Sequence, residues 1–280
     1  MTIDYASTRR SPSALSPIGM VASFVRHRAI ISQIAKRDVV ARYKGSYLGV
    51  LWSLITALMM LMVYAFVFGF IFHSKWGPDQ SKVDFALTLF SGLLVYNVFA
   101  ETISRAPTLV TSNPGYVKKV VFPLETLPVA ALFTALVNGL ASLAVLLVAW
   151  VGFHHSISST IWLFPLMLLP VCMGTLGLAW FLASLGVFIR DVAHPTGVLV
   201  QVLMFMSAVF YPLGNLSHRD QKLLMLNPLV TMLENVRRTL IWSQPPVWRW
   251  WAYAMAGSFV ALQLGYYWFM RSRKAFADVI

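Results

Sequence analysis

The sequence predicts an all-α integral membrane protein with six membrane-spanning helices. Of its 280 residues, 58% are hydrophobic and only 11% are charged, and the mean hydropathy is +0.70. A soluble globular chain carries about 25% charged residues, so one soluble core could not bury this much apolar surface. The apolar residues form long runs, whereas a membrane β-barrel would show alternating segments of about ten residues.

Six apolar runs are long enough to be spans, because crossing about 30 Å of hydrocarbon takes about 20 apolar residues. They cover residues 48–72, 85–104, 126–152, 161–189, 195–214 and 250–270. With the N-terminus inside, the cytoplasmic segments hold fifteen lysines and arginines and the outer segments seven. We therefore expect both termini to be cytoplasmic. The same flanking residues, facing anionic headgroups, account for the net charge of +12 without nucleic acid.

The chain before the first span is expected to have two parts. Residues 1–19 lack the apolar core of a signal peptide and are interpreted as a disordered cytoplasmic tail. Residues 20–44 predict an amphipathic helix in the cytoplasmic interface, with its apolar stripe in lipid. The stripe consists of Met20, Val21, Phe24, Ile31, Ile34 and Ala35.

A corner follows this helix, and the transmembrane domain is taken to begin there, covering 45–280. Gly45-Ser46 ends the helix, and the chain turns into the membrane at Leu48-Gly49. Arg42 and Lys44 are left at headgroup depth, where they could bind a phosphate-bearing lipid head. Charge alone is equally compatible with simple anchoring.

The cytoplasmic connection 105–125 has the pattern of a short structured element. Asn113-Pro114 resembles a helix start, Tyr116 to Val121 would form about two turns, and Pro123 would end them. This pattern favours a docking element for a partner, although a basic surface loop is the alternative. Just before it, Glu101 and Arg105 have the spacing of a structural ion pair.

The outer connection 218–246 is expected to form gate helices. Asn227-Pro228 predicts a helix start and Pro245-Pro246 a stop. One face is apolar: Leu229, Met232, Leu233, Val236 and Leu240. The charged residues Glu234, Arg237 and Arg238 mark another face. A re-entrant or surface helix fits this pattern, and an interfacial anchor is the alternative, supported by Trp242, Trp248, Trp250 and Trp251.

No catalytic motif is present in the sequence, and the single cysteine, Cys172, excludes disulfides and cysteine metal sites. We expect no catalytic residue, metal ligand or cofactor on this chain. Ion-coupled carriers place ionisable groups inside the bundle, and no charged residue falls in the middle of a predicted span. Energy for transport would therefore enter through a partner. A membrane enzyme acting on lipid-linked sugars is the competing hypothesis, with Asp38 and Arg42 as its sole local candidates.

Four stretches resemble the polysaccharide ABC exporter permeases, in order from about residue 35 to 242. RDVVARYKGSYLGVLWSLITALMMLMVYAFVFGFIF is similar to their opening, and NPGYVKKVVFPLETLP to their coupling helix. RDVAHPTGVLVQVLMFMSAVFYPL resembles the region of spans four and five, and NPLVTMLENVRRTLI the outer gate helix.

The resemblance implies a type-2 ABC exporter fold in the bacterial inner membrane. It implies a homodimer of six-span subunits with two copies of a separate ATPase, which would hold ATP and Mg. The cargo would be a polysaccharide, foremost of O-antigen type, on a polyprenyl pyrophosphate lipid, moved from the cytoplasmic to the outer side. Capsule, teichoic acid, and smaller lipids or drugs are the alternatives.

The resemblance also suggests site residues. Those docking in the ATPase cleft would be Asn113, Pro114, Gly115, Tyr116, Val117, Lys118, Lys119 and Val120. Those at the entry of the lipid pyrophosphate would be Arg42, Tyr43, Lys44, Gly45, Ser46, Leu48 and Gly49. From the physical pattern we add an aromatic glycan path, formed by Tyr64, Phe68 and Phe72 at every fourth position and joined by Phe99 and Tyr211. Aromatic residues that simply pack or face lipid are the alternative.

Overall fold

A computed structural model describes residues 16–44, 46–49, 51–72, 76, 81–117 and 122–280. These residues form helices joined by turns and contain no strand. The α-helices are α1 (Pro17–Arg26), α2 (Arg28–Tyr43), α3 (Leu51–Tyr64), α4 (Lys82–Arg105), α5 (Pro114–Val117), α6 (Thr126–His154), α7 (Phe164–Phe188), α8 (Ala193–Met206), α9 (His218–Leu224), α10 (Pro228–Leu240), α11 (Trp248–Ser272) and α12 (Phe276–Val279). A π-helix (Ala65–Ile71) continues α3.

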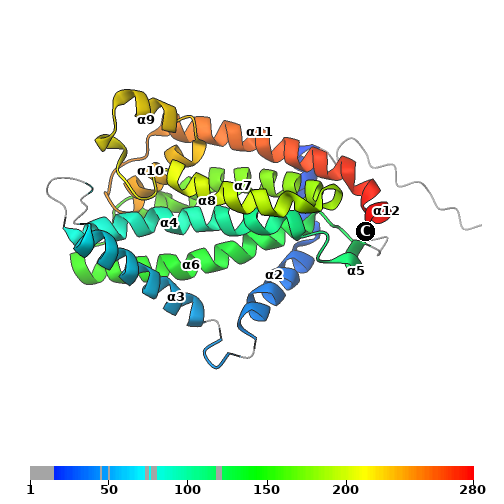
Figure 1. Cartoon of the computed structure of the whole chain (residues 1–280), viewed down its shortest axis with the longest axis horizontal. Coiled ribbons are helices and arrows are strands. Elements are labelled where there is room, and N and C mark those ends of the chain that lie inside the picture. The colour runs from blue at the N-terminus through cyan, green and yellow to red at the C-terminus, as the bar shows by residue number, and fades with distance from the viewer. Residues whose placement is uncertain (1–15, 45, 50, 73–75, 77–80, 118–121) are drawn as a thin grey trace, which may run out of the picture.

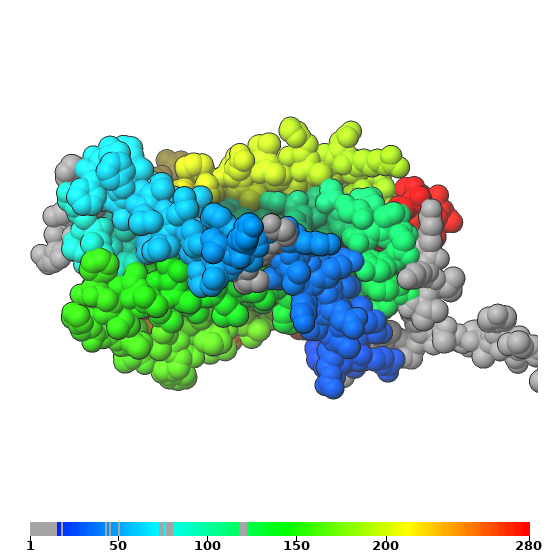
Figure 2. Space-filling model, turned by 90° about the horizontal axis from the view of Figure 1, so that it is seen from below, coloured from blue at the N-terminus to red at the C-terminus, as the bar shows by residue number. Residues whose placement is uncertain are grey.

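The long helices α4, α6, α7 and α11 run along the long axis of the molecule (Figure 1). α5 and α12 lie at one end, which we call the α5 end, and α9 and α10 lie at the other, the α10 end (Figure 1). α2 and α3 form an open V on one flank, and Figure 2 shows both crossing that face. α4 is the central helix, since it packs against α3, α6, α7, α8 and α10.

Four helices in the part of the chain that the structure describes are long and apolar enough to cross a membrane. They are Leu51–Ile71, Lys82–Thr108, Thr126–His154 and Ile161–Phe188. These match the first four predicted spans. α11 coincides with the sixth predicted run and has 25 residues, but polar residues such as Arg249 and Gln263 lower its hydropathy.

The fifth predicted span is shorter than expected. α8 has 14 residues, or about 21 Å at 1.5 Å per residue. The helix ends at Met206, so the predicted end at residue 214 is wrong. Beyond it, Ala208 has a positive φ of 50°, a left-handed conformation that no α-helix can contain.

The N-terminal segment departs from the sequence expectation in two ways. It forms two helices instead of one, with the break at His27, and α1 already begins at Pro17 inside the predicted tail. The side chain of Ser16 caps α1 by accepting a hydrogen bond from the Gly19 backbone N–H at 3.1 Å. The remainder of the predicted tail, residues 1–15, lies outside the described residues.

The apolar stripe of these helices packs against protein and not, as expected, against lipid. Met20, Ile31, Ile34 and Ala35 are buried with residues of α6, α7 and α11, whereas Val21 is exposed. Phe24 explains the attraction, because its ring stacks on Trp180 of α7 at 5.6 Å and meets Tyr266 of α11 edge-on at 6.3 Å. Such aromatic pairs contribute about 0.5–1.5 kcal/mol beyond their buried area.

Very close packing joins α7 to α11. A Cβ atom on Gly265 would overlap the backbone carbonyl of Gly177, and a Cβ on Gly177 would overlap the carbonyl of Ala261. Small residues let membrane helices approach in this way, since packing drives their association in lipid.

We expect Gly265→Ala to destabilise the fold by about 1–3 kcal/mol, because the helices must separate to admit the methyl group. Thermal unfolding in detergent micelles measures this as a lower midpoint. Gly257→Ala on the same helix is the matched control, since a Cβ there meets nothing within 4 Å. Equal midpoints for the two variants would contradict the close crossing.

Candidate functional site

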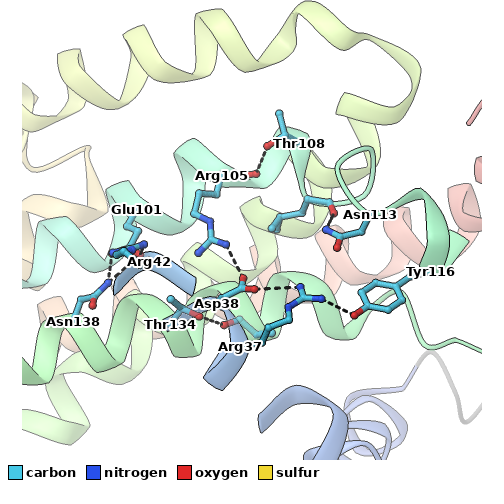
Figure 3. Close-up of polar contacts among 12 residues, drawn as sticks. Arg37, Asp38, Arg42, Glu101, Arg105, Thr108, Asn113, Tyr116, Thr134 and Asn138 are labelled. Carbon is cyan, nitrogen blue, oxygen red and sulfur yellow. Dashed lines mark hydrogen bonds and ion pairs between the residues drawn. The ribbon is translucent and has the colours of Figure 1, made fainter. Parts of the chain in front are cut away.

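A group of charged side chains joins α2 to the central helix at the α5 half of the molecule (Figure 3). Arg42 Nη2 of α2 donates to Glu101 Oε1 of α4 at 2.5 Å. Asn138 Nδ2 of α6 donates to both carboxylate oxygens of Glu101, at 3.1 and 2.9 Å. Glu101 therefore ties three helices together.

The prediction of an ion pair between Glu101 and Arg105 is wrong, because both side chains pair with residues of α2 instead. Arg105 Nη2 donates to Asp38 Oδ2 at 2.7 Å. Asp38 and Arg42 stand four residues apart on α2, as Glu101 and Arg105 do on α4. The two helices thus exchange two ion pairs about one turn apart, and each is partly shielded from solvent. The pair that was expected between Glu101 and Arg105 lies within one helix, and such a pair would contribute only about 0.2–0.5 kcal/mol to stability.

The same helix contacts the predicted docking element. Arg37 Nη1 donates to the Tyr116 hydroxyl of α5 at 2.7 Å, and its Nη2 donates to Asp38 at 3.2 Å. The Tyr116 ring stacks on Phe122 with centroids 4.3 Å apart. A continuous chain of polar contacts therefore runs from α5 through α2 to α4 (Figure 3).

The predicted helix start at Pro114 is confirmed, and its described part is a single turn ending at Val117. Pro114 and Gly115 are exposed and Val117 is buried. Asn113 Nδ2 donates to the Leu109 carbonyl at 2.9 Å, which holds the preceding turn. The other predicted docking residues, Lys118, Lys119 and Val120, lie outside the described residues.

A cavity of about 460 Å³ lies between α2, α3, α4 and α6. Its polar lining consists of Arg42, Ser53, Thr56, Asn97, Glu101, Asn138 and Ser142. No sequence motif marks this site, because its residues come from four separate segments of the chain. The available signal was the recurrence of asparagine and hydroxyl residues within apolar runs.

Arg42 is the predicted entry residue of the lipid head that the structure places in the lining of this cavity. Lys44, Tyr47 and Leu48 are exposed at the corner between α2 and α3. Gly49 has a φ of 51°, so the turn requires glycine there. Tyr43 ends α2, and Gly45 lies outside the described residues.

The predicted aromatic path is brought together in part. Tyr64, Phe68 and Phe72 follow one another with centroid distances of 6.4 and 5.8 Å. Phe210, which was not predicted, joins them by stacking on Phe68 at 5.7 Å.

The two other predicted members of that path lie elsewhere. Phe99 is buried beside Tyr96 in the core. Tyr211 donates its hydroxyl to the Phe205 carbonyl at 2.9 Å and packs in a separate cluster. Tyr211 lies beyond the end of α8 at Met206, and Phe99 lies on α4, so neither side chain joins the other three aromatics.

The predicted start of the outer helix is confirmed, since the Asn227 side chain accepts from the Leu229 N–H at 3.0 Å. The predicted apolar face of α10 is buried among α4, α7 and α11, as a helix inserted into the bundle requires. An interfacial anchor would leave this face outside the bundle.

Placing Arg237 on the charged face was wrong, because its side chain is only 1% exposed. It donates to the backbone carbonyls of Ala208 and Val209 at 3.0 and 2.9 Å. Its guanidinium lies 4.3 Å from the centroid of the Trp76 ring. Burial lowers the pKa of Arg237 to about 10, opposed by nearby Glu234, so it stays charged at neutral pH. The two accepting carbonyls belong to non-helical residues that follow the end of α8, where no helical N–H is available to bond to them.

Comparison with known proteins identifies the family. The family model described as ABC-2 type transporter matches residues 30–241. The O-antigen export system permease protein RfbA of Myxococcus xanthus is 28% identical over 218 residues, covering 77% of this chain and 82% of that protein. A protein of the same name from Klebsiella pneumoniae is 23% identical over 71% of this chain and 75% of its own length. The polysialic acid transport protein KpsM of Escherichia coli is 22% identical, over 79% and 84%.

We expect Glu101→Gln to lower the free energy of unfolding by about 1–2 kcal/mol, because Arg42 then keeps a charge without its ion partner. A double-mutant cycle with Arg42→Gln should show a coupling energy of about 1 kcal/mol, measured by chemical unfolding in detergent micelles.

The matched cycle combines Glu101→Gln with Arg105→Gln, and its coupling should stay below about 0.5 kcal/mol. A larger coupling to Arg105 than to Arg42 would contradict the pairing between α2 and α4.

Proposed function

The chain belongs to the ABC-2 type transporter family, and on this basis we propose that it is the permease subunit of an ATP-driven polysaccharide exporter. As an integral membrane protein with polysaccharide ABC permeases as relatives, it fits this role directly. The cargo we propose is an O-antigen-type glycan on polyprenyl pyrophosphate, moved from the cytoplasmic to the outer side of a bacterial inner membrane. A capsule glycan is the alternative, because one relative is named for polysialic acid transport.

The proposed assembly contains two copies of this chain and two copies of a separate ATPase. Its six spans would be α3 with its π-helix, α4, α6, α7, α8 and α11. Both termini would be cytoplasmic, which puts the α5 end inside and the α10 end outside. A second copy has an apolar surface available on α3 and its π-helix, where Leu58, Met62 and Phe66 are exposed.

The observation that carries the proposal is the position of α5. Its residues Pro114 and Gly115 are exposed at the end of the bundle, while Tyr116 is bonded to Arg37 of α2. An ATPase bound to the exposed side could therefore move α2, and α2 holds α4 through two ion pairs. An enzyme acting on lipid-linked sugars would not need such an exposed element.

The lipid head would enter at the corner between α2 and α3. Lys44 is exposed there and could meet a pyrophosphate, with Arg42 one half-turn before it on the helix. Arg42 forms an ion pair with Glu101, so its positive charge is partly neutralised before a lipid head arrives. The glycan would then pass the aromatic side chains of Tyr64, Phe68 and Phe72, with Phe210 in the place expected for Tyr211.

We expect Gly115→Trp to abolish binding of the ATPase and to reduce surface glycan at least tenfold. A Cβ atom added at Gly115 meets no described atom within 4 Å, and the residue is exposed, so we expect a larger side chain to project from the docking surface. Co-purification with the ATPase and quantification of surface glycan in cells lacking the native gene measure the two effects.

Gly214→Trp is the matched control, because Gly214 also has open space around it and lies towards the α10 end. It should retain ATPase binding. Normal ATPase binding and export by Gly115→Trp would count against α5 as the docking element.

A further inference from the structure

The cavity beside Glu101 contains a polar group that the fold itself does not use. Every position from Phe85 to Phe99 on α4 is buried except Asn97, which is exposed to the cavity. Its side chain makes no hydrogen bond within the part of the chain that the structure describes. Because Asn97 is exposed, its amide is open to a ligand, and polar groups within a membrane bundle mark substrate sites.

The charge of the cavity indicates the chemistry of its ligand. Arg42 is neutralised by Glu101, so the lining carries no net positive charge. A phosphate would meet the Glu101 carboxylate at close range, and like charges repel. Amides and hydroxyls, such as Asn97 and Thr56, both donate and accept hydrogen bonds. A neutral ligand rich in hydroxyl groups matches this lining.

The size and walls of the cavity fit one such group. Its volume of about 460 Å³ lies within the range of about 300–1,000 Å³ that is typical of small-ligand pockets. Met60, Phe90 and Leu94 form an apolar part of the wall, suited to the apolar face of a sugar ring.

The position of the cavity connects it to the proposed entry of the lipid head. Arg42 lies on the last turn of α2, directly before the corner, and also lines the cavity. A group attached to a pyrophosphate at the corner would therefore extend between α2 and α3 towards Asn97.

We propose that this cavity binds the neutral sugar attached directly to the lipid pyrophosphate. This assignment rests on the proposed function and adds a subsite to it: Asn97, Asn138 and Thr56 recognise hydroxyl or acetamido groups of that sugar. The pyrophosphate itself stays outside, at the corner.

The test compares two probes with the full chain in lipid nanodiscs. One is a polyprenyl diphosphate that carries a single N-acetylhexosamine, and the other is the same lipid without the sugar. The wild type should bind the sugar-bearing lipid about tenfold more tightly, the contribution of one or two hydrogen bonds. Asn97→Leu should remove this difference and leave the affinity for the bare lipid unchanged.

Asn215→Leu is the matched control, since Asn215 is exposed in the connection after α8, and it should keep the wild-type difference. Thr56→Val keeps the shape of the side chain and removes its hydroxyl, and it should weaken binding of the sugar-bearing lipid about threefold. This second variant keeps the proposal testable if Asn97→Leu fails to fold. Thermal unfolding verifies that all variants are folded.

Three results would overturn the assignment. Equal wild-type affinity for both lipids would exclude the sugar subsite while leaving the proposed function intact. Phosphatidylglycerol could compete with the sugar-bearing lipid for the wild type and fail to compete for Asn97→Leu. That result would identify a phospholipid headgroup as the occupant of the cavity. Binding of neither lipid by the wild type would overturn the proposed substrate class, and the subsite with it.

Discussion

The α5 half of the bundle depends on the neutralisation of one carboxylate. Glu101 lies on α4, the helix that is most completely surrounded by others, and an unpaired carboxylate there would cost several kcal/mol. Arg42 from α2 and Asn138 from α6 both bond to it. This requirement fixes where α2 can lie, and the position of α2 in turn creates the polar cavity and brings Arg37 to α5.

In the α10 half of the bundle, a buried positive charge needs partners, as the carboxylate of Glu101 does in the α5 half. Arg237 is buried, and it is held by the carbonyls of Ala208 and Val209 and by the ring of Trp76. Those carbonyls are free because α8 ends early, so the short helix and the buried arginine require each other. In the proposed exporter, this contact would hold the outer helix α10 in place while the cargo passes, because moving α10 would separate the buried guanidinium from these partners.

Local sequence patterns predicted the helices well but not their partners. The length and hydropathy of the runs located α3, α4, α6 and α7, and Asn227-Pro228 located the start of α10. The apolar stripe of α1 and α2 could not tell lipid from protein, since both are apolar. Glu101 and Arg42 are 59 positions apart, and no spacing rule links such residues. Phe210 was missed because it lies beyond the end of α8, where the left-handed Ala208 turns the chain and sequence spacing does not show which side chain faces Phe68.

The arrangement of α2 explains how a chain without charged groups in the middle of its spans could use energy from a partner. Arg37, Asp38 and Arg42 occupy less than two turns of one helix, or about 8 Å. Within that length α2 contacts α5, α4 and the cavity. A helix is stiff over so short a distance, so a displacement of α5 that moves Arg37 would also move Arg42 at the cavity. A proton relay is then unnecessary, because the mechanical link from the proposed ATPase site to the proposed lipid site is only one helix long.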